Sequence, residues 1–282
     1  MLSKQFAFVI LIALFFASCS SNGKDARPII AVSLEPQKNI LEHIAGDDFR
    51  IVSIMNGSDN PETFEPSTSK RIDIENCLVY FSTSLLPFEK RIESASSNKS
   101  KFVDTSKGID LIYGTHSHGN HSHTVADPHV WTSVKNAKII ARNMADKLAE
   151  INPQNADSYT KNLDAYIAHL DSLDLAIKNK LAATSGKFIV WHPSLSYFAK
   201  DYDLEQVAVS AESKELSVAS LADVIERVKG DGINVMFYQR EMDTRQAQMI
   251  AKSAGIAIHP INVVDYDWEN QLNDIANELS NH

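Results

Sequence analysis

Histidine is concentrated in one short stretch of this 282-residue chain. Residues 116–131 read HSHGNHSHTVADPHVW, and four imidazoles fall within the first eight positions: His116, His118, His121 and His123. Neutral imidazole is a preferred ligand for zinc and the later first-row metals, and a short His-rich tract is a compositional sign of metal binding. The intervening Ser, Gly and Asn show no helix or strand pattern. We therefore expect residues 115–124 to form a mobile His-rich loop that gathers metal; a solubilising loop is the alternative interpretation.

Four other side chains are placed where a fold could assemble a site. His129 and His192 each stand at an end of an apolar run and next to a proline. Asp265 directly follows the run Ile261–Val264, and Glu62 lies in the loop after the second expected strand. In open α/β sheets, ligands bind at the carboxyl ends of strands. These residues are far apart along the chain, so any site they form must be assembled by the fold, and we expect it in a cleft between lobes.

The composition limits which ligands and partners are available. A formal net charge of −9 and the absence of a basic run argue against nucleic acid, because no such run could neutralise phosphates. The chain has two cysteines, Cys19 and Cys77. Cys77 lies in the apolar run Cys77–Phe81, where a buried, inert thiol is the simpler interpretation. A metal site would therefore use histidine and carboxylate ligands.

The N-terminal segment has the pattern of a targeting signal. Residues 6–17 read FAFVILIALFFA, which is too short to span a bilayer comfortably, and small residues stand just before Cys19. The tetrapeptide FASC resembles a bacterial lipobox, with Phe16 in place of the usual Leu. We expect residues 1–18 to be a signal peptide, Cys19 to be lipidated, and residues 19–27 to be a tether. A plain secreted protein cleaved nearby is the alternative.

The rest of the chain alternates short apolar runs with helical periodicity, which predicts an α/β fold with parallel sheets. Residues 28–152 contain expected strands at 28–34, 49–55, 77–82 and 101–104 and a helix over 133–150. Apolar residues then recur at helical spacing from Tyr159 to Leu181. This pattern predicts a helix of roughly thirty residues, or about 45 Å, which is long enough to join two lobes. Gly186 ends this helical pattern, and strands and helices alternate again over residues 185–282. We expect two α/β lobes joined by a rigid helix over 153–184, with a metal site in the cleft between them.

Several segments resemble one known family. DPHVW and its following helix, the pattern of Tyr159, Asn162, Tyr166 and Leu170, and the closing INVVDYDW are similar to the cluster A-I solute-binding lipoproteins of bacterial ABC importers. This family takes up zinc or manganese, and a His-rich stretch before DPH resembles its zinc-uptake branch. The match extends over most of the mature chain.

The resemblance implies a set of metal ligands. The family's ligands fall on His129, His192 and Asp265, and its first histidine falls on Glu62 in NPETFEP, where this chain departs from the family pattern. Oxygen ligands shift preference toward harder ions such as Mn²⁺ or Fe²⁺, whereas the His-rich loop favours Zn²⁺. We choose Zn²⁺ and keep Mn²⁺ or Fe²⁺ as alternatives.

The resemblance also implies a function. We expect a monomeric, lipid-anchored protein in the periplasm or at the cell surface that binds Zn²⁺ and passes it to an ABC importer permease, and that is not an enzyme. A secreted zinc hydrolase is the alternative from another class. This sequence contains no His-Glu-x-x-His, Gly-x-Ser-x-Gly or phosphate-loop motif that would support such an enzyme.

Overall fold

The computed structural model describes residues 25–282 except 119–120, 185, 210–215 and 241–244, and describes no side chains within 115–123. The expected signal peptide and Cys19 lie outside the described residues. The secondary structure expected from sequence periodicity is confirmed over both halves of the chain, apart from the His-rich segment.

The N-terminal lobe is built on a four-stranded parallel sheet with the order β2-β1-β3-β4. Its strands and helices alternate along the chain: β1 (Ile29–Val32), α1 (Glu35–Ala45), β2 (Arg50–Ser53), α2 (Thr68–Asn76), β3 (Val79–Ser82), α3 (Pro87–Ala95) and, after the 3-10 turn Lys99–Lys101, β4 (Phe102–Asp104). β1 and β3 are buried, as expected for strands covered on both faces by helices.

The C-terminal lobe repeats this plan with the order β10-β9-β7-β8. Its elements are β7 (Lys187–Val190), α6 (Ser196–Asp201), β8 (Glu205–Ala208), α7 (Val218–Gly230), β9 (Val235–Gln239), α8 (Arg245–Ala254), β10 (Ala257–Ile261) and α9 (Trp268–Ser280). In each lobe the first strand lies between the second and the third. Both sheets therefore have a switch point beside their first strand, where ligands of such sheets usually bind.

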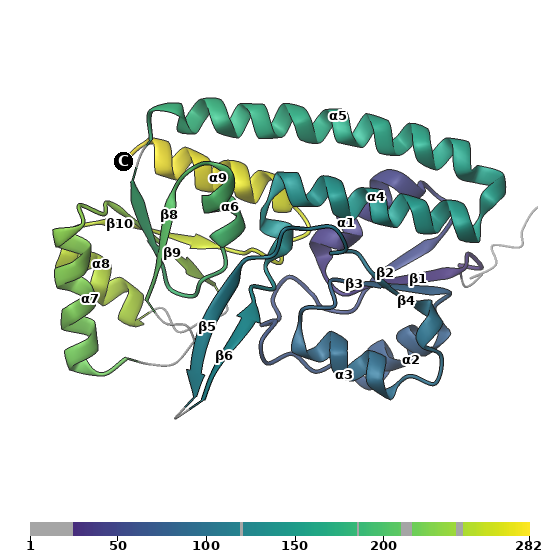
Figure 1. Ribbon diagram of the computed structural model, residues 1–282, viewed down its shortest axis with the longest axis horizontal. Coiled ribbons are helices and arrows are strands. Elements are labelled where there is room, and N and C mark those ends of the chain that lie inside the picture. The colour runs from purple at the N-terminus through teal and green to yellow at the C-terminus, as the bar shows by residue number, and fades with distance from the viewer. Residues whose placement is uncertain (1–24, 119–120, 185, 210–215, 241–244) are drawn as a thin grey trace, which may run out of the picture.

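Two antiparallel helices connect the lobes. α4 (Val134–Ile151) packs on α1, and after the 3-10 turn Pro153–Asn155 the chain returns as α5 (Ala156–Lys180), which ends in the 3-10 turn Leu181–Ala183. α5 runs along the top of both lobes in Figure 1. Its 25 residues correspond to about 38 Å. The expectation of two α/β lobes joined by a long helix is confirmed.

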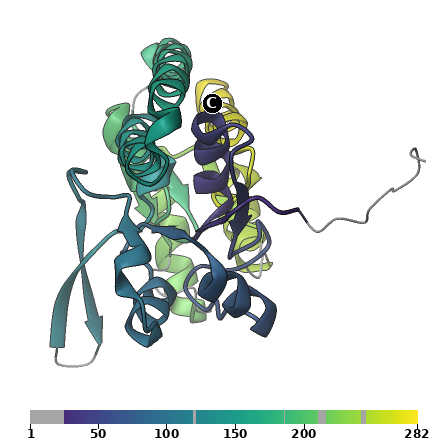
Figure 2. The ribbon, with the colours of Figure 1, turned by 90° about the vertical axis from the view of Figure 1, so that its right-hand side faces the viewer.

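The expectation that the His-rich segment has no strand pattern is wrong for its described backbone. β5 (Tyr113–His118) and β6 (His121–Ala126) pair as an antiparallel hairpin that extends away from the two lobes (Figures 1 and 2). The register pairs His116 with His123 and His118 with His121. The physical reason is that the histidines are two residues apart within each strand, and that the segment carries Thr115, Thr124 and Val125, which favour strands. The amino-acid composition of the segment does not reveal this spacing.

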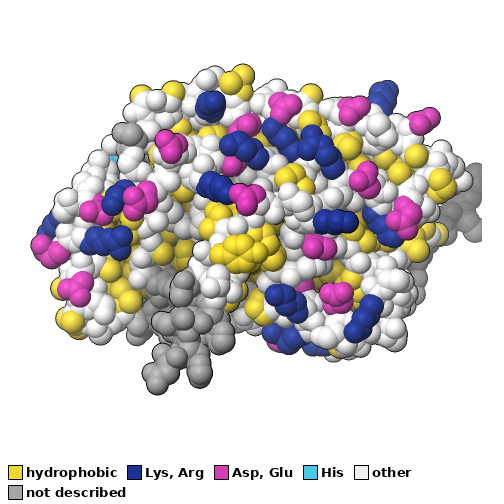
Figure 3. Space-filling view, in the orientation of Figure 1, with side chains coloured by type: hydrophobic (Ala, Val, Ile, Leu, Met, Phe, Trp, Pro, Cys, Tyr) yellow, Lys and Arg dark blue, Asp and Glu magenta, His cyan; other side chains and the backbone are white. Residues whose placement is uncertain are grey.

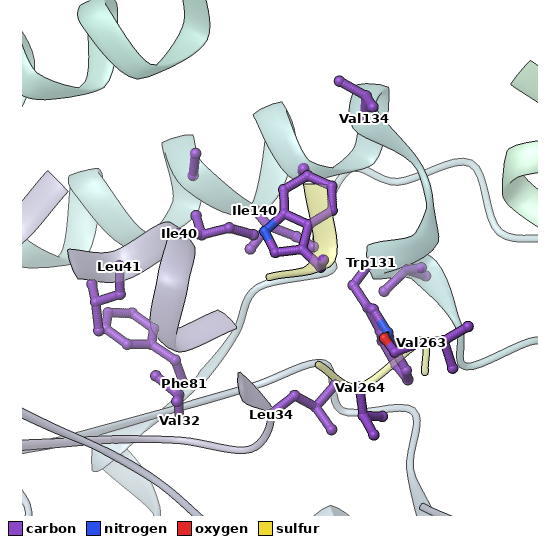
Figure 4. Close-up of a cluster of buried hydrophobic side chains, with 14 of the residues drawn as sticks. Val32, Leu34, Ile40, Leu41, Phe81, Trp131, Val134, Ile140, Val263 and Val264 are labelled. Atoms are coloured by element: carbon purple, nitrogen blue, oxygen red, sulfur yellow. The ribbon is translucent and has the colours of Figure 1, made fainter. Parts of the chain in front are cut away.

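The lobes share one hydrophobic core. Trp131, in the 3-10 turn Val130–Thr132 that follows His129, lies near Val263 and Val264 of the C-terminal lobe, with Leu34 of the N-terminal lobe beside them (Figure 4). The Trp131 indole N–H donates a hydrogen bond of 2.6 Å to the Val263 carbonyl. Because this indole is 1% exposed, its loss would open a cavity between the lobes. The lobes are thus packed against each other as well as joined by α5.

The surface seen in Figure 3 carries basic and acidic side chains side by side. Several of them form ion pairs, among them Lys200 with Asp110 at 2.6 Å and Lys135 with Asp201 at 3.2 Å. Within the described part of the chain, none of the helices has the length and apolar character needed to cross a bilayer.

Candidate metal centre

The described residues bring three of the four expected ligands to one small pocket between the lobes. Glu62, His129 and His192 line it together with Asn60, Pro61, Ser194, Gln239 and Val263. These residues come from the loop after β2, the segment before α4, and the carboxyl ends of β7, β9 and β10. The position agrees with the rule that open α/β sheets bind ligands beyond the carboxyl ends of their strands.

His129 is held by the carboxylate two residues before it. Asp127 Oδ1 accepts hydrogen bonds from the His129 backbone N–H at 2.9 Å and from Nδ1 of its ring at 2.8 Å. Burial raises the pKa of Asp127, but the charge and hydrogen bonds of His129 outweigh it and hold that pKa below its usual range. With Nδ1 donating to the carboxylate, Nε2 is the nitrogen with a lone pair for a cation. A carboxylate that orients a histidine in this way is typical of metal ligands.

His192 follows β7 and is fixed through its backbone. The Gln239 amide at the end of β9 accepts from the His192 N–H at 3.3 Å and donates to the His192 carbonyl at 2.9 Å and to the Ser194 hydroxyl at 2.7 Å. The rings of His192 and His129 lie 5.3 Å apart, edge to face, and both residues are 5% exposed. The two lobes therefore each contribute one buried imidazole.

Glu62 reaches the pocket from the surface. Its backbone N–H donates to Asn60 Oδ1 at 2.9 Å, which forms a turn that directs the loop toward the cleft. Its Oε1 lies 3.4 Å from Nε2 of His192, and its side chain is 37% exposed. The carboxylate thus occupies the mouth of the pocket, whereas the imidazoles form its floor.

Asp265 does not line the pocket with the other three; Val263 does. Both carboxylate oxygens of Asp265 accept local hydrogen bonds: Oδ2 from the Asn262 side chain at 3.2 Å and Oδ1 from the Asp267 N–H at 3.0 Å. Asn262 also donates to the Gly57 carbonyl of the other lobe at 2.7 Å. Among the described residues, the ligand atoms in this cleft are not gathered within 4.8 Å of one another. Complete coordination therefore requires side chains here to move.

Sequence reasoning missed the residues that position the histidines. Asp127 is the first residue of the DPH motif. Its position two residues before His129 is suited to a carboxylate that bonds to the His129 ring, so it could have been selected from the sequence. Gln239 ends the apolar run before it and could have been found by the same strand-end argument that selected His192. The contact of Trp131 was also missed. Its partner Val263 lies 132 residues away, and no local sequence pattern connects the two residues.

Two lobes of like topology, a stiff connecting helix and a histidine-lined pocket between them define a two-lobed solute-binding protein. The sequence model described as "Zinc-uptake complex component A periplasmic" matches residues 30–276. The chain belongs to this family, and the resemblance seen in the sequence is confirmed.

Individual relatives agree with this assignment. A crystal structure of ZnuA is 31% identical, covers 90% of this chain and 98% of its own, and superposes with a TM-score of 0.80. A zinc-bound deletion mutant of ZnuA is 31% identical with a TM-score of 0.81, over 90% of this chain and 97% of its own. The zinc-binding lipoprotein AdcA of Streptococcus pneumoniae is 28% identical over 90% of this chain. The match spans only 54% of AdcA, so this chain corresponds to about half of that relative.

Proposed function

We propose that this protein captures Zn²⁺ outside the cytoplasmic membrane and delivers it to the permease of an ABC importer. The observation that carries the proposal is the approach of His129 and His192, one from each lobe, with Glu62 beside them. The fold belongs to a family described as a component of a zinc-uptake complex. Because metal would bind to both lobes at once, its presence or absence can be read by a permease as a change at the lobe interface.

The spacing of His192 and Glu62 suits a tetrahedral ion. Two ligand atoms about 2.0–2.1 Å from a tetrahedral Zn²⁺ lie roughly 3.3–3.4 Å from each other. The separation between His192 Nε2 and Glu62 Oε1 is 3.4 Å. His129 would supply a third ligand through Nε2. Asp265 would be the fourth, by exchanging its bonds to Asn262 and Asp267 for the ion.

Zinc is our choice among the divalent metals, with Mn²⁺ or Fe²⁺ as the alternatives. Two imidazoles and two carboxylates form a ligand set that zinc accepts, although oxygen ligands also suit harder ions. Relatives named for zinc include AdcA and the zinc-bound ZnuA mutant. The family assignment and these names together favour zinc.

The hairpin histidines are proposed as an accessory. His116, His118, His121 and His123 stand at paired positions of β5 and β6, outside the lobes, and would raise the local concentration of zinc near the cleft.

We further propose that Cys19 anchors the protein by lipid to a membrane facing the periplasm or the outside of the cell. The protein would act there as a monomer without catalytic activity.

The central test is a zinc competition titration of His129→Ala and His192→Ala. It is run in a background where the four hairpin histidines are replaced by Asn, so that the hairpin cannot mask the result. We expect each substitution to weaken zinc binding at least about 100-fold, because a metal site loses one of its few ligands. His169→Ala is the matched control, since His169 lies on α5 and pairs with Glu269.

Tight binding that survives in both His129→Ala and His192→Ala would contradict the site. Circular dichroism of each variant separates loss of a ligand from loss of the fold. The competing hydrolase function is tested on the zinc-loaded protein with chromogenic ester and phosphate substrates. Turnover that depends on zinc would overturn the transport assignment.

A further inference from the structure

A second group of metal-type ligands lies in the C-terminal lobe. It consists of His259 in β10, Glu278 in the last turn of α9, and His282 beyond the end of α9. One ligand atom from each residue lies within 4.8 Å of the other two. Among the described residues, no other trio of His, Cys, Asp or Glu satisfies this condition.

This trio is separated from the cleft by the sheet itself. His282 lines a hollow with Lys187 and Val235, the first residues of β7 and β9. The cleft instead lies beyond the carboxyl ends of the same strands, at His192 and Gln239. His282 and the cleft therefore lie at opposite ends of the strands of this parallel sheet, and His259 lies at the middle of β10. The C-terminal end of the chain lies at the outer side of this lobe in Figure 1.

The backbone around the trio is anchored. His259 is paired with Phe237 in the β10–β9 ladder, and its ring centroid lies 6.2 Å from that of Phe237. The His282 carbonyl accepts a hydrogen bond of 3.3 Å from the Asn234 side chain. The His259 and His282 rings are 6.1 Å apart. Glu278 lies in the last turn of α9, and His282 follows two residues after that helix ends. β10, the last turn of α9 and the bond from Asn234 thus hold the backbone at the three positions.

The polar atom at the centre of the trio has no hydrogen-bond partner among the described residues. Nε2 of His259 is buried, and Glu278 Oε2 lies 3.4 Å from it. A buried nitrogen left without a hydrogen-bond partner destabilises the folded state, and such atoms in a folded protein call for an explanation. A cation between His259 Nε2 and Glu278 Oε2 would give both atoms a partner, and the imidazole of His282 would supply a third ligand.

We propose that His259, Glu278 and His282 form a second site for a later first-row divalent cation, with Zn²⁺ as the best match. Two imidazoles and one carboxylate suit zinc, whereas Mg²⁺ and Ca²⁺ prefer oxygen ligands alone. The three side chains leave a coordination position for water. The site binds less tightly than a closed four-ligand site, and the bound ion ties the end of α9 to β10.

The test counts zinc ions per chain in the background without hairpin histidines. That protein, and His259→Gln, Glu278→Gln and His282→Gln in the same background, are dialysed against a range of zinc concentrations. The parent is expected to bind a tight ion and a weaker one. Each substitution in the trio should weaken the second ion at least tenfold and leave the first unchanged. His169→Gln is the matched control, because it removes an imidazole from a His–Glu pair that no third metal-type ligand joins among the described residues.

A second readout follows the stability of the fold. Excess zinc should raise the Tm of the parent further than that of His282→Gln, since only the parent can join α9 to β10 through the ion. His282→Gln changes an exposed side chain beyond the helix, so the folded state is retained. Unchanged binding of the second ion in both His259→Gln and His282→Gln overturns the proposal, and so does a parent that binds one ion only. Loss of the tight ion in His192→Ala with the weaker ion retained shows the two sites to be independent.

Discussion

At the scale of single residues, the bond between Asp127 and His129 determines which nitrogen faces the pocket. The carboxylate accepts from Nδ1, which leaves the lone pair of Nε2 for the ion and fixes the orientation of the ring. His192 is held differently, by its backbone bonds to Gln239. The two imidazoles are therefore oriented by independent neighbours, and each neighbour can be altered without removing a ligand.

The first prediction concerns the carboxylate behind His129. Asp127→Asn keeps the size of the side chain but removes its charge, so zinc affinity should fall about 10–100-fold. Isothermal titration of zinc into the variant measures this loss. Asp174→Asn is the control, because Asp174 accepts a bond from Tyr202 and lies outside the pocket lining. An affinity equal to that of the parent would show that Asp127 does not orient the ligand.

The second prediction concerns the family position that Glu62 occupies. Glu62→His replaces a carboxylate by an imidazole, which favours zinc over manganese. We expect the ratio of zinc to manganese affinity to rise at least about tenfold, a change of about 1.4 kcal/mol. Competition between the two ions on the same sample measures the ratio. Glu65→His is the control, since Glu65 in the same loop pairs with Arg91 at 2.7 Å. An equal rise of this affinity ratio in Glu65→His would show that a histidine anywhere on this surface loop produces it, and would contradict a ligand role for residue 62.

At the scale of elements, Tyr197 of α6 connects the C-terminal lobe to both ends of the hairpin. Its hydroxyl donates to the Asp127 carbonyl at 2.9 Å and accepts from the Ile112 N–H at 3.2 Å. Asp127 is two residues before His129, so this contact also locates the DPH segment. Burial of the ring raises the pKa of Tyr197 to about 12.

The third prediction follows from that raised pKa. The folded state favours the neutral phenol, so the stabilisation is complete below pH 10 and is lost as the pH rises toward about 12. Tyr197→Phe should cost about 1–2 kcal/mol near neutral pH by leaving the Ile112 N–H without its partner. Its unfolding free energy should then fall less steeply than that of the parent above pH 10. Urea denaturation at several pH values measures both effects, and Tyr113→Phe, at an exposed position, is the control. Parallel pH curves for parent and variant would refute this reasoning.

At the scale of the whole molecule, α5 is attached to both lobes along one side. Asn162 donates to the Ile44 carbonyl at 3.0 Å, and Tyr159 bonds to Asp48, both in the N-terminal lobe. Tyr166 donates to Glu269 of α9 at 2.8 Å and stacks on His43 of α1 with centroids 4.5 Å apart. The Tyr-Asn-Tyr spacing noted in the sequence thus has a structural explanation. It fastens the connecting helix to each lobe.

The fourth prediction is that metal changes the overall shape very little. A continuous core and a doubly fastened helix oppose a clamshell opening, so metal-free and zinc-loaded protein should have the same radius of gyration within error. Small-angle X-ray scattering in both states measures this. The His129→Ala variant with zinc is the control for ions bound elsewhere. A clearly expanded metal-free state would mean that the lobes separate despite these contacts.

The sequence by itself determined the elements and the strand ends. Helical and strand periods are local properties of a chain, so α4, α5 and the alternating strands could be predicted from the spacing of apolar residues. His192 was likewise predictable, because it directly follows a buried strand and carboxyl ends of strands face the ligand. His129 depended partly on family resemblance, and so did the choice of Glu62 and Asp265 as its partners.

Only the tertiary structure decided which side chains meet. Whether the His-rich segment pairs with itself depends on cross-strand hydrogen bonds, which composition does not reveal. The bonds of Asp265 to Asn262 and Asp267, and the presence of Val263 in its place at the pocket, depend on how the segment after β10 turns. His259, Glu278 and His282 come together because α9 folds back on β10. Contacts between residues distant in sequence depend on the packing of whole elements, and no local pattern encodes that packing.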